Sequence, residues 1–216
     1  MLLDINRLER DGYFLLRGVP EDDLVRSVAI LGGVRVDPRS PDPVRAIRPQ
    51  DVTSAKQNTL SSRYGTGAFP FHTDTAHWDR PARYLVLYCV NPGEGARATL
   101  LEDTHAWALN EVERDLACRA LWTTGHVRAS FCMVAEESGP NLAIRYDMDC
   151  MRPMTGEALR LKALIGARIQ VCNRVQIDWE AGSLLIIDNQ RMVHARGSSA
   201  RPDSGRIHKR MLIGGA

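Results

Sequence analysis

The chain has 216 residues, of which 44% are hydrophobic and 25% charged, the composition of a globular protein with a sizeable core. Its 28 basic residues are scattered among 26 acidic ones, and the net charge of +2 argues against a nucleic-acid partner. No apolar run approaches the roughly 20 residues of a membrane span, and the first residues lack a signal-peptide pattern, so we expect a cytoplasmic single domain over residues 1–216 with no membrane partner.

The five cysteines give no sign of a disulfide framework or a zinc site. They stand at positions 89, 118, 132, 150 and 172, widely separated and without a CxxC pair. We therefore expect reduced, mostly buried thiols.

Residue patterns typical of helices occur near the N-terminus and again in the middle of the chain. Asp4 suits a helix N-cap and Gly12 a helix end, and the acidic residues 21–23 suit the positive end of a second helix. Apolar residues at helical spacing indicate two further helices. The predicted helices are residues 5–11, 21–31, 107–121 and 155–168.

Short strands divided by Gly and Pro turns make up most of the remaining chain. Residues 37–49 hold four prolines and read as loop, and residues 57–70 combine a short strand with a glycine-rich turn. This pattern predicts a mainly β fold with flanking helices around a double-stranded β-helix, or jelly-roll, core. The predicted strands are residues 13–16, 84–90, 98–101, 128–134, 141–146, 175–179, 184–187 and 206–213.

The segment Phe71-His72-Thr73-Asp74 is the strongest local signal of a metal site. Residues two apart at the end of a strand point to the same side, so His72 and Asp74 can reach one metal ion. A chance His-x-Asp pair is common, and a third ligand is needed. His194, which closely follows the apolar strand 184–187, completes the two-histidine, one-carboxylate triad of non-haem iron(II) oxygenases.

The other histidines have no comparable partner pattern. We expect surface or satisfied core positions for them. They are His77, His105, His126 and His208.

The chain resembles the clavaminate synthase-like and taurine dioxygenase-like branch of iron(II), 2-oxoglutarate oxygenases over about residues 57–213. The segments that carry the resemblance are FHTDTAHWDRPARYLVLYCVNPGEGARATLLED and LLIIDNQRMVHARGSSARPDSGRIHKRMLI. Four elements agree in order and spacing: the His-x-Asp pair, a threonine 25 residues after Asp74, a histidine 120 residues after Asp74, and an arginine 12 residues after that histidine.

The resemblance implies iron(II), 2-oxoglutarate and dioxygen as cofactor and co-substrates. It implies that His72, Asp74 and His194 are the catalytic iron ligands, and that Arg206 and Thr99 hold the far carboxylate of 2-oxoglutarate. A bidentate guanidinium suits a buried carboxylate, and a hydroxyl can satisfy a remaining lone pair.

Substrate contacts are less defined. Arg210 matches the position at which several relatives hold an acidic group of the substrate, and strand alternation places Arg206, His208 and Arg210 on one face. Arg196 is a second candidate, although ion pairs with local acids would explain both Arg196 and Arg210 as structural residues. Residues near the iron motif that are predicted to line the pocket are Phe69, Trp78 and Ser61, with Leu60, His77, Arg145 and Asp147 as weaker candidates.

The implied activity is hydroxylation of an unactivated C–H bond in a small amino acid or other small acidic metabolite, with release of succinate and CO2. Asp74 disfavours halogenation, because halogenating relatives lack this carboxylate. Desaturation, cyclisation and epimerisation use the same triad and stay open. The alternatives from other classes are a cupin-like metal-dependent isomerase or hydrolase and a non-catalytic binding protein.

The chain is shorter than many of these relatives, which bears on how a substrate would be enclosed. Insertions that form a lid are candidates for the missing length. A flexible loop or a partner subunit in a homo-oligomer is then expected to close the site.

Overall fold

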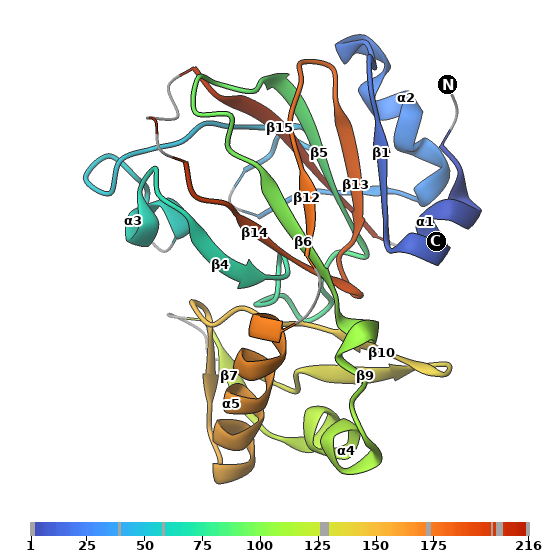
Figure 1. The fold of residues 1–216 in the computed structure, drawn as a ribbon, viewed down its shortest axis with the longest axis vertical. Coiled ribbons are helices and arrows are strands. Elements are labelled where there is room, and N and C mark those ends of the chain that lie inside the picture. Colours follow the sequence, from blue (N-terminus) through green and yellow to red (C-terminus); the bar gives the residue numbers. More distant parts are fainter. Residues whose placement is uncertain are drawn as a thin grey trace.

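The computed structural model places two antiparallel sheets above a smaller unit of helices and short strands (Figure 1). It describes residues 3–38, 40–57, 59–125, 130–171, 174–199, 201 and 205–214. The helices are α1 (Ile5–Asp11), η1 (Glu21–Asp23), α2 (Leu24–Val28), η2 (Ala29–Leu31), α3 (Leu60–Tyr64), η3 (Thr104–Trp107), α4 (Glu111–Arg119) and α5 (Gly156–Val171), where η marks a 3-10 helix.

The strands are short and follow one another closely in the chain. They are β1 (Tyr13–Leu16), β2 (Val34–Arg35), β3 (Arg45–Ile47), β4 (Phe69–His72), β5 (Tyr84–Asn91), β6 (Thr99–Asp103), β7 (Trp122–Thr124), β8 (Ser130–Cys132), β9 (Ala135–Ser138), β10 (Asn141–Ile144), β11 (Met151–Pro153), β12 (Val175–Ile177), β13 (Leu184–Asp188), β14 (Met192–Arg196) and β15 (Ile207–Ile213).

The larger sheet has the order β1-β13-β5-β15-β2, and β3 also pairs with β15. All five residues of β13 are buried, because both faces of this sheet are covered. Leu184 and Ile186 pack with residues of α1 and α2 on one face. Leu185 and Ile187 belong to the core on the other face. An apolar run without polar alternation is the expected sequence of such a strand.

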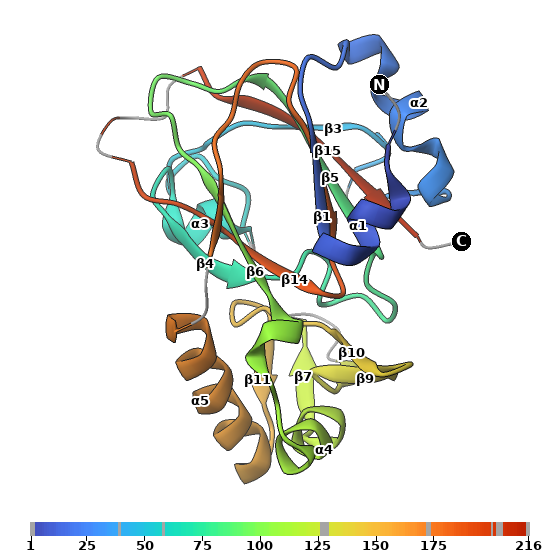
Figure 2. The same cartoon turned by 45° about the vertical axis from the view of Figure 1, so that its right-hand side comes forward.

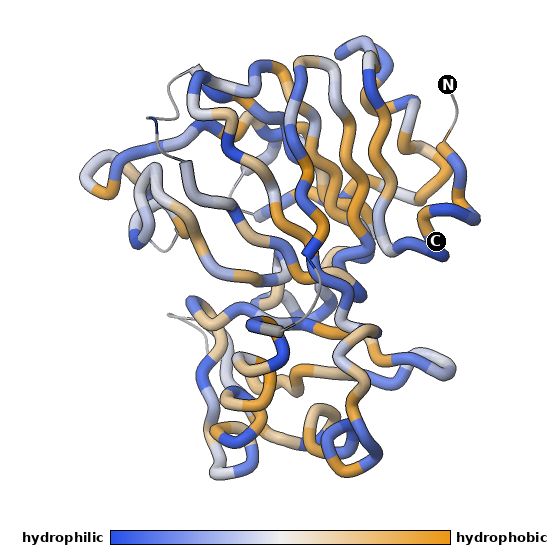
Figure 3. Tube along the Cα trace, in the orientation of Figure 1, coloured by the Kyte–Doolittle hydropathy of each residue, from blue (hydrophilic) through white to orange (hydrophobic). Residues whose placement is uncertain are grey.

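The second sheet has the order β12-β6-β14-β4 and packs against the larger one. The core between them joins Leu85 and Leu185 of the larger sheet to Leu101, Ile177 and Met192 of the second sheet. Figure 3 shows the hydrophobic runs of β5 and β13 side by side in this part of the molecule.

The smaller unit lies below the second sheet, as the turned view in Figure 2 also shows. It holds α4, α5, the sheet β11-β7-β8 and the hairpin β9-β10. Its core includes Trp107, Trp122 and Leu161, together with Phe71 and Val193 from the second sheet. One continuous apolar cluster therefore joins the smaller unit to the strands that carry His72 and His194.

Local signals fixed several elements correctly. Asp4 accepts a hydrogen bond from the backbone of Arg7, and Gly12 ends α1 with φ of 76°. The strand predicted at 184–187 is β13, and the strand predicted at 206–213 is β15. The predicted helix 155–168 is α5, which runs on to Val171.

The segment 57–70, where a short strand was expected, contains the helix α3 before its glycine-rich turn, and strand occurs only at Phe69 and Pro70, where β4 begins. Thr59 caps α3, accepting from the backbone of Ser62 while the Ser62 side chain accepts from the backbone of Thr59. The loop expected at 37–49 contains β3, which pairs with β15. Both errors come from polar or proline-rich segments whose structure depends on local caps or distant partners.

The helix predicted at 107–121 begins only at Glu111. Asn110 caps it in a reciprocal pair with Glu113, and Ala108 adopts a left-handed φ of 48° that separates η3 from α4. The helix predicted at 21–31 is divided into η1, α2 and η2. The strand predicted at 128–134 corresponds to β8, and its first two residues, like His126, lie outside the described residues.

The cysteines that the structure describes are free, with Cys89 and Cys132 buried and Cys118 and Cys150 half-buried. Cys172 lies outside the described residues. Among the helices described, none is both long enough and apolar enough to cross a membrane.

Candidate metal centre

Two histidines meet across one pair of antiparallel strands. His72 is the last residue of β4, His194 is the central residue of β14, and the two are direct cross-strand partners. Their ring centroids lie 4.2 Å apart. Side chains of such partners stand on the same face of a sheet, so the strand pairing itself brings the two imidazoles together.

Asp74 follows β4 and completes the group. One ligand atom from each of His72, Asp74 and His194 lies within 4.8 Å of the other two. The nearest carboxylate oxygen of Asp74 is 3.7 Å from Nε2 of His72. The three residues that the sequence predicted as ligands are therefore adjacent in space, and both histidines are buried.

The protonation states of Asp74 and His194 suit a cation. Burial alone would raise the pKa of Asp74, but the charge of Arg210 and the contact with His72 outweigh it and hold that pKa below its usual range. Burial and the neighbouring His72 lower the pKa of His194 to about 3. At neutral pH Asp74 is thus an anion and His194 a neutral imidazole, the forms that bind metals.

His72 is oriented by its other ring nitrogen. Nδ1 lies 3.1 Å from the carbonyl oxygen of Pro70, which leaves Nε2 facing Asp74. Such a second contact is the usual way in which a protein fixes the tautomer of a ligand histidine. Burial lowers the pKa of His72, but the contact with Asp74 and the charge of Asp147 outweigh it and raise that pKa.

The donor set fits iron(II). Two imidazoles and one carboxylate are the ligands of the facial triad that non-haem iron(II) oxygenases use. Nδ1 of His194 is a buried ring nitrogen without a hydrogen-bond partner among the described residues. A buried polar atom without a hydrogen-bond partner costs free energy, unless a group that is not part of the protein chain interacts with it.

A second buried polar group joins Thr99 to Arg206 through two aromatic residues. Trp179 donates to the hydroxyl of Thr99 at 3.1 Å. The Trp179 ring meets the His208 ring edge to face, with centroids 4.5 Å apart. Nδ1 of His208 accepts from Nε of Arg206 at 3.3 Å. The two residues predicted to hold 2-oxoglutarate thus lie at the two ends of one contact chain.

Arg210 is in contact with the metal-ligand group. Its guanidinium donates to Asp74 Oδ2 at 3.1 Å and to Asp37 Oδ2 at 3.5 Å. Asp37 is only 5% exposed and also faces Arg45 at 3.8 Å. The residue predicted as a substrate contact therefore lies beside the triad with a buried acid behind it.

Arg196 lies on β14 but is engaged with the glycine turn that follows α3. It donates to the carbonyls of Gly67 at 2.7 Å and Gly65 at 2.6 Å. Its guanidinium also lies over the Phe69 ring, 4.5 Å from the centroid. These contacts favour the structural alternative for Arg196.

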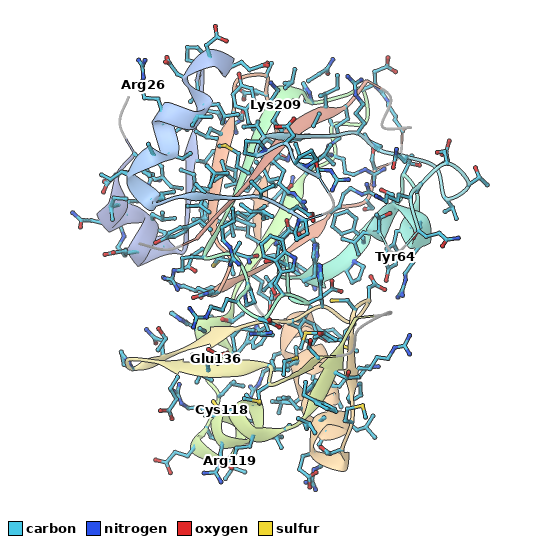
Figure 4. The ribbon with its side chains drawn as sticks, turned by 180° about the vertical axis from the view of Figure 1, so that it is seen from behind. Arg26, Tyr64, Cys118, Arg119, Glu136 and Lys209 are labelled. Atoms are coloured by element: carbon cyan, nitrogen blue, oxygen red, sulfur yellow. The ribbon has the colours of Figure 1, made fainter. Side chains whose placement is uncertain are left out.

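Phe69, Trp78 and Ser61 lie on three different segments of the chain. The Phe69 ring contacts the His72 ring edge to face at 5.3 Å, so it adjoins a ligand. Trp78 is half-buried, with the Arg35 guanidinium 4.8 Å from its ring centroid. Ser61 lies on α3, the helix that also carries Tyr64 (Figure 4).

The helix α3 is tied to the turn after β10. The Tyr64 hydroxyl donates to Asp149 Oδ1 at 3.2 Å, and Arg63 forms an ion pair with the same carboxylate. Asp147, from the same turn, is close enough to His72 to raise its pKa. This turn was among the weaker pocket candidates, together with Arg145, whose guanidinium donates to the carbonyls of Trp78 and Asp79.

Sequence reasoning missed four residues of this region. Strand alternation places His208 on the same face as Arg206 and is a signal that could have found it, although the sequence pattern predicts only a surface or core position for this histidine. Nothing in the local pattern marked the others as neighbours of the site. The four are Asp37, Trp179, Asn189 and His208.

Comparison with a known family covers the first half of the chain. The family described as "Taurine catabolism dioxygenase TauD, TfdA family" matches residues 3–116, more than half of the 216 residues. That range includes His72, Asp74 and Thr99. The chain belongs to this family. It is accordingly an oxidoreductase of the dioxygenase class, and the predicted family is confirmed by a match that contains the first of the two motifs.

Solved structures of iron oxygenases share the fold of this TauD/TfdA family member. An asparagine oxygenase in complex with Fe(II), 2S,3S-3-hydroxyasparagine and succinate superposes with a TM-score of 0.77 at 17% identity, over 97% of this chain and 77% of that one. The non-haem iron oxygenase OrfP with Fe and α-ketoglutaric acid gives 0.76 at 17% identity, over 97% and 78%.

A third solved structure is PvcB from Pseudomonas aeruginosa, with a TM-score of 0.70 at 19% identity over 97% of this chain and 78% of that one. PvcB is described as an Fe, α-ketoglutarate-dependent oxygenase of an isonitrile synthetic pathway. At these identities the likeness concerns the fold. A comparison with curated protein sequences gave no match.

Proposed function

We propose that this TauD/TfdA family member is an iron(II)- and 2-oxoglutarate-dependent dioxygenase whose iron is bound by His72, Asp74 and His194. The observation that carries the proposal is the convergence of two imidazoles and a carboxylate with ligand atoms within 4.8 Å of one another. Such a triad leaves three coordination positions for co-substrate and dioxygen. Iron(II) bound there supplies dioxygen activation coupled to the oxidative decarboxylation of 2-oxoglutarate to succinate and CO2.

Arg206 and Thr99 are proposed to hold the far carboxylate of 2-oxoglutarate. Arg206 is 8% exposed, and its guanidinium is held by Nη1 donating to the carbonyl of Arg97 at 2.7 Å. A guanidinium can give a carboxylate two parallel hydrogen bonds, and the Thr99 hydroxyl adds a further donor. In this buried setting a charge-assisted pair is stronger than at the surface.

We propose that the substrate is a small amino acid or another small acidic metabolite, and that the reaction is hydroxylation of an unactivated C–H bond. Arg210, beside the triad, is the residue proposed to receive the acidic group. Two structural relatives support the amino-acid class, since one was solved with 3-hydroxyasparagine and another with (3S)-hydroxy-L-Arg. Phe69, Trp78 and Ser61 remain proposed pocket residues, and desaturation, cyclisation and epimerisation remain alternative outcomes.

The architecture is proposed to be one double-stranded β-helix domain over residues 1–216. Two facing antiparallel sheets enclose a common core, and the smaller unit shares an apolar cluster with Phe71 and Val193 of the second sheet. A cytoplasmic location is part of the proposal and is supported by the free cysteines described. Closure of the site by a second copy of the chain remains a proposal as well.

The metal assignment can be tested with purified protein. Anaerobic addition of iron(II) and then 2-oxoglutarate is expected to give a metal-to-ligand charge-transfer band, and admission of air is expected to give succinate. His72→Ala and His194→Ala are each expected to abolish both signals. His105→Ala is the matched control, because His105 is an exposed histidine of η3. Unchanged succinate formation in the His72 and His194 variants would refute the assignment.

The same experiment separates the other classes of function. A cupin-like isomerase or hydrolase would bind a divalent ion yet remain indifferent to 2-oxoglutarate and dioxygen. A binding protein without catalytic function would show neither metal nor spectral change. Neither class accounts for the buried Thr99 and Arg206.

A screen of amino acids and small acids for substrate-dependent succinate formation identifies the substrate. Mass spectrometry of the product is expected to show the gain of one oxygen atom. Loss of two hydrogens would instead assign desaturation or cyclisation.

A further inference from the structure

The backbone of Asp74 is held by the side-chain amide of Asn189. Oδ1 of Asn189 accepts the Asp74 N–H at 2.8 Å, and Nδ2 donates to the Asp74 carbonyl at 2.9 Å. The same Nδ2 donates to the carbonyl of Ala82, also at 2.9 Å. The Asn189 amide thus holds both ends of the loop 74–82, because its oxygen accepts one hydrogen bond and its nitrogen donates two.

Asn189 is itself fixed in the turn between β13 and β14. It is fully buried, and its backbone N–H donates to the carbonyl of Arg83 at 2.9 Å. Five residues later the chain reaches His194, the cross-strand partner of His72. Strand pairing therefore sets the relative position of the two histidines, whereas Asp74 lies beyond the end of β4 and depends on other contacts.

The backbone after Asp74 is in a conformation that needs support. Thr75 has φ of 59°, a left-handed value that is unfavourable for a β-branched residue. Its hydroxyl accepts the backbone N–H of Ala82 at 2.8 Å, which folds the loop back on itself. Such a conformation persists when surrounding contacts hold it, and the three Asn189 hydrogen bonds are contacts of this kind.

We propose that Asn189 is a positioning residue of the metal centre, which sets the direction of the Asp74 carboxylate by holding the backbone on both sides of its Cα. This inference rests on the proposed function. Asn189 acts through Asp74 and does not bind the metal or the substrate. The amide is required because it offers one acceptor and two donors on a short side chain: aspartate lacks the donors, serine has one, and glutamine is a methylene longer in a fully buried space.

Two substitutions test the role. Asn189→Asp keeps the shape and the acceptor for the Asp74 N–H but turns oxygen toward the carbonyls of Asp74 and Ala82. Asn189→Ala removes all three hydrogen bonds. The matched control is Gln190→Ala, the next amide in the same turn, which accepts from Arg83 at 2.9 Å and is outside the Asn189–Asp74 contact. Ile165→Ala, in the core of the smaller unit, controls for loss of stability alone.

Three measurements are made on each variant. Hydrogen–deuterium exchange of metal-free protein is expected to be faster within residues 74–82 in the Asn189 variants only. Iron(II) affinity, measured by anaerobic titration, is expected to fall at least tenfold. The charge-transfer band formed with 2-oxoglutarate is expected to shift or broaden, because a small error in ligand position alters the metal geometry. Gln190→Ala is expected to match the wild type.

Wild-type exchange, affinity and band position in a folded Asn189→Asp or Asn189→Ala protein would overturn the inference. An equal loss of iron affinity in Ile165→Ala, at a matched drop in melting temperature, would overturn it too, since general destabilisation would then explain the result. Failure of the proposed function is distinguishable, because it leaves the wild type without a charge-transfer band. The exchange within residues 74–82 then decides alone whether Asn189 holds this loop.

Discussion

The guanidinium of Arg210 lies between two carboxylates, 3.1 Å from Asp74 Oδ2 and 3.5 Å from Asp37 Oδ2. One cation is thus shared by a proposed iron ligand and a buried acid on a distant part of the chain. A metal ion that takes up the charge of Asp74 leaves Asp37 as the counterion of Arg210. An acidic substrate group would therefore meet an arginine that is oriented in advance and already partly neutralised.

Replacement of Arg210 by methionine is expected to raise the KM for the acidic substrate at least tenfold. A hydrogen bond to a charged group contributes about 1.5–3 kcal/mol, which corresponds to a change of this size. Steady-state kinetics with the substrate from the screen provide the measurement. Lys209→Met is the control, because Lys209 points to the other face of β15 and forms an ion pair with Glu21. Lys209 lies far from the smaller unit (Figure 4). An unchanged KM would argue that Arg210 is structural.

Replacement of Arg206 by lysine is expected to weaken 2-oxoglutarate binding by about tenfold to a hundredfold. Lysine keeps the charge but loses the planar fork that can bind a carboxylate at two points. Titration of the charge-transfer band with 2-oxoglutarate measures the affinity directly. Arg201→Lys, at an exposed position nearby in sequence, is expected to leave it unchanged. Equal affinity in both variants would contradict the proposed carboxylate site.

His208 is expected to make the metal-free protein less stable in acid. Burial and the charge of Arg206 lower the pKa of His208 to about 3, whereas an unfolded histidine titrates near 6.5. Between these two pKa values, His208 is protonated in the unfolded chain and neutral in the folded protein. The stabilisation is complete above about pH 6.5 and is lost as the pH falls toward 3, at up to about 1.4 kcal/mol per pH unit.

The variant His208→Gln keeps an acceptor near Arg206 and removes this titration. Its free energy of unfolding, measured by denaturant titration between pH 4 and 7, is expected to change less steeply with pH than that of the wild type. His194, with a pKa lowered in the same way, should still contribute to the remaining slope. Identical slopes in the two proteins would count against the buried neutral state of His208.

Alkylation of the native protein is expected to be slow at the buried Cys89 and the half-buried Cys150. Burial raises the pKa of the Cys89 thiol to about 11 and also raises that of Cys150. Because the thiolate is the reactive form, a rise of about two pKa units reduces it about a hundredfold near pH 8. Peptide mass spectrometry after brief iodoacetamide treatment should find both residues unmodified in native protein and modified in denaturant. Rapid native labelling of Cys89 would show that its strand opens readily.

Elements with complete local signals were predictable from the sequence. The cap at Asp4 and the glycine at the end of α1 act within one helical turn, and the apolar run of β13 reflects burial on both faces. The helix α3 was not predicted, because the capping box that begins at Thr59 lies in a polar segment whose sequence is also typical of a turn. The segment became recognisable as α3 only with its reciprocal hydrogen bonds to Ser62.

The sequence by itself determined the donor set of the site. His72 and Asp74 share a motif whose spacing follows from the pleat of a strand, and His194 closely follows the apolar strand 184–187. The family resemblance then supplied Thr99 and Arg206. These residue types indicate the chemistry of the site, because imidazole, carboxylate and guanidinium groups at this order and spacing have few common roles.

Only the tertiary structure decided how these groups are held. Asn189 reaches Asp74 across 115 positions and Arg210 reaches Asp37 across 173, and Arg196 was drawn instead to the carbonyls of Gly65 and Gly67. Such contacts leave no periodic trace in the sequence. A hydrogen bond depends on distance and direction in space, and those are fixed when the two sheets, the turn after β13 and the loop after β4 pack together.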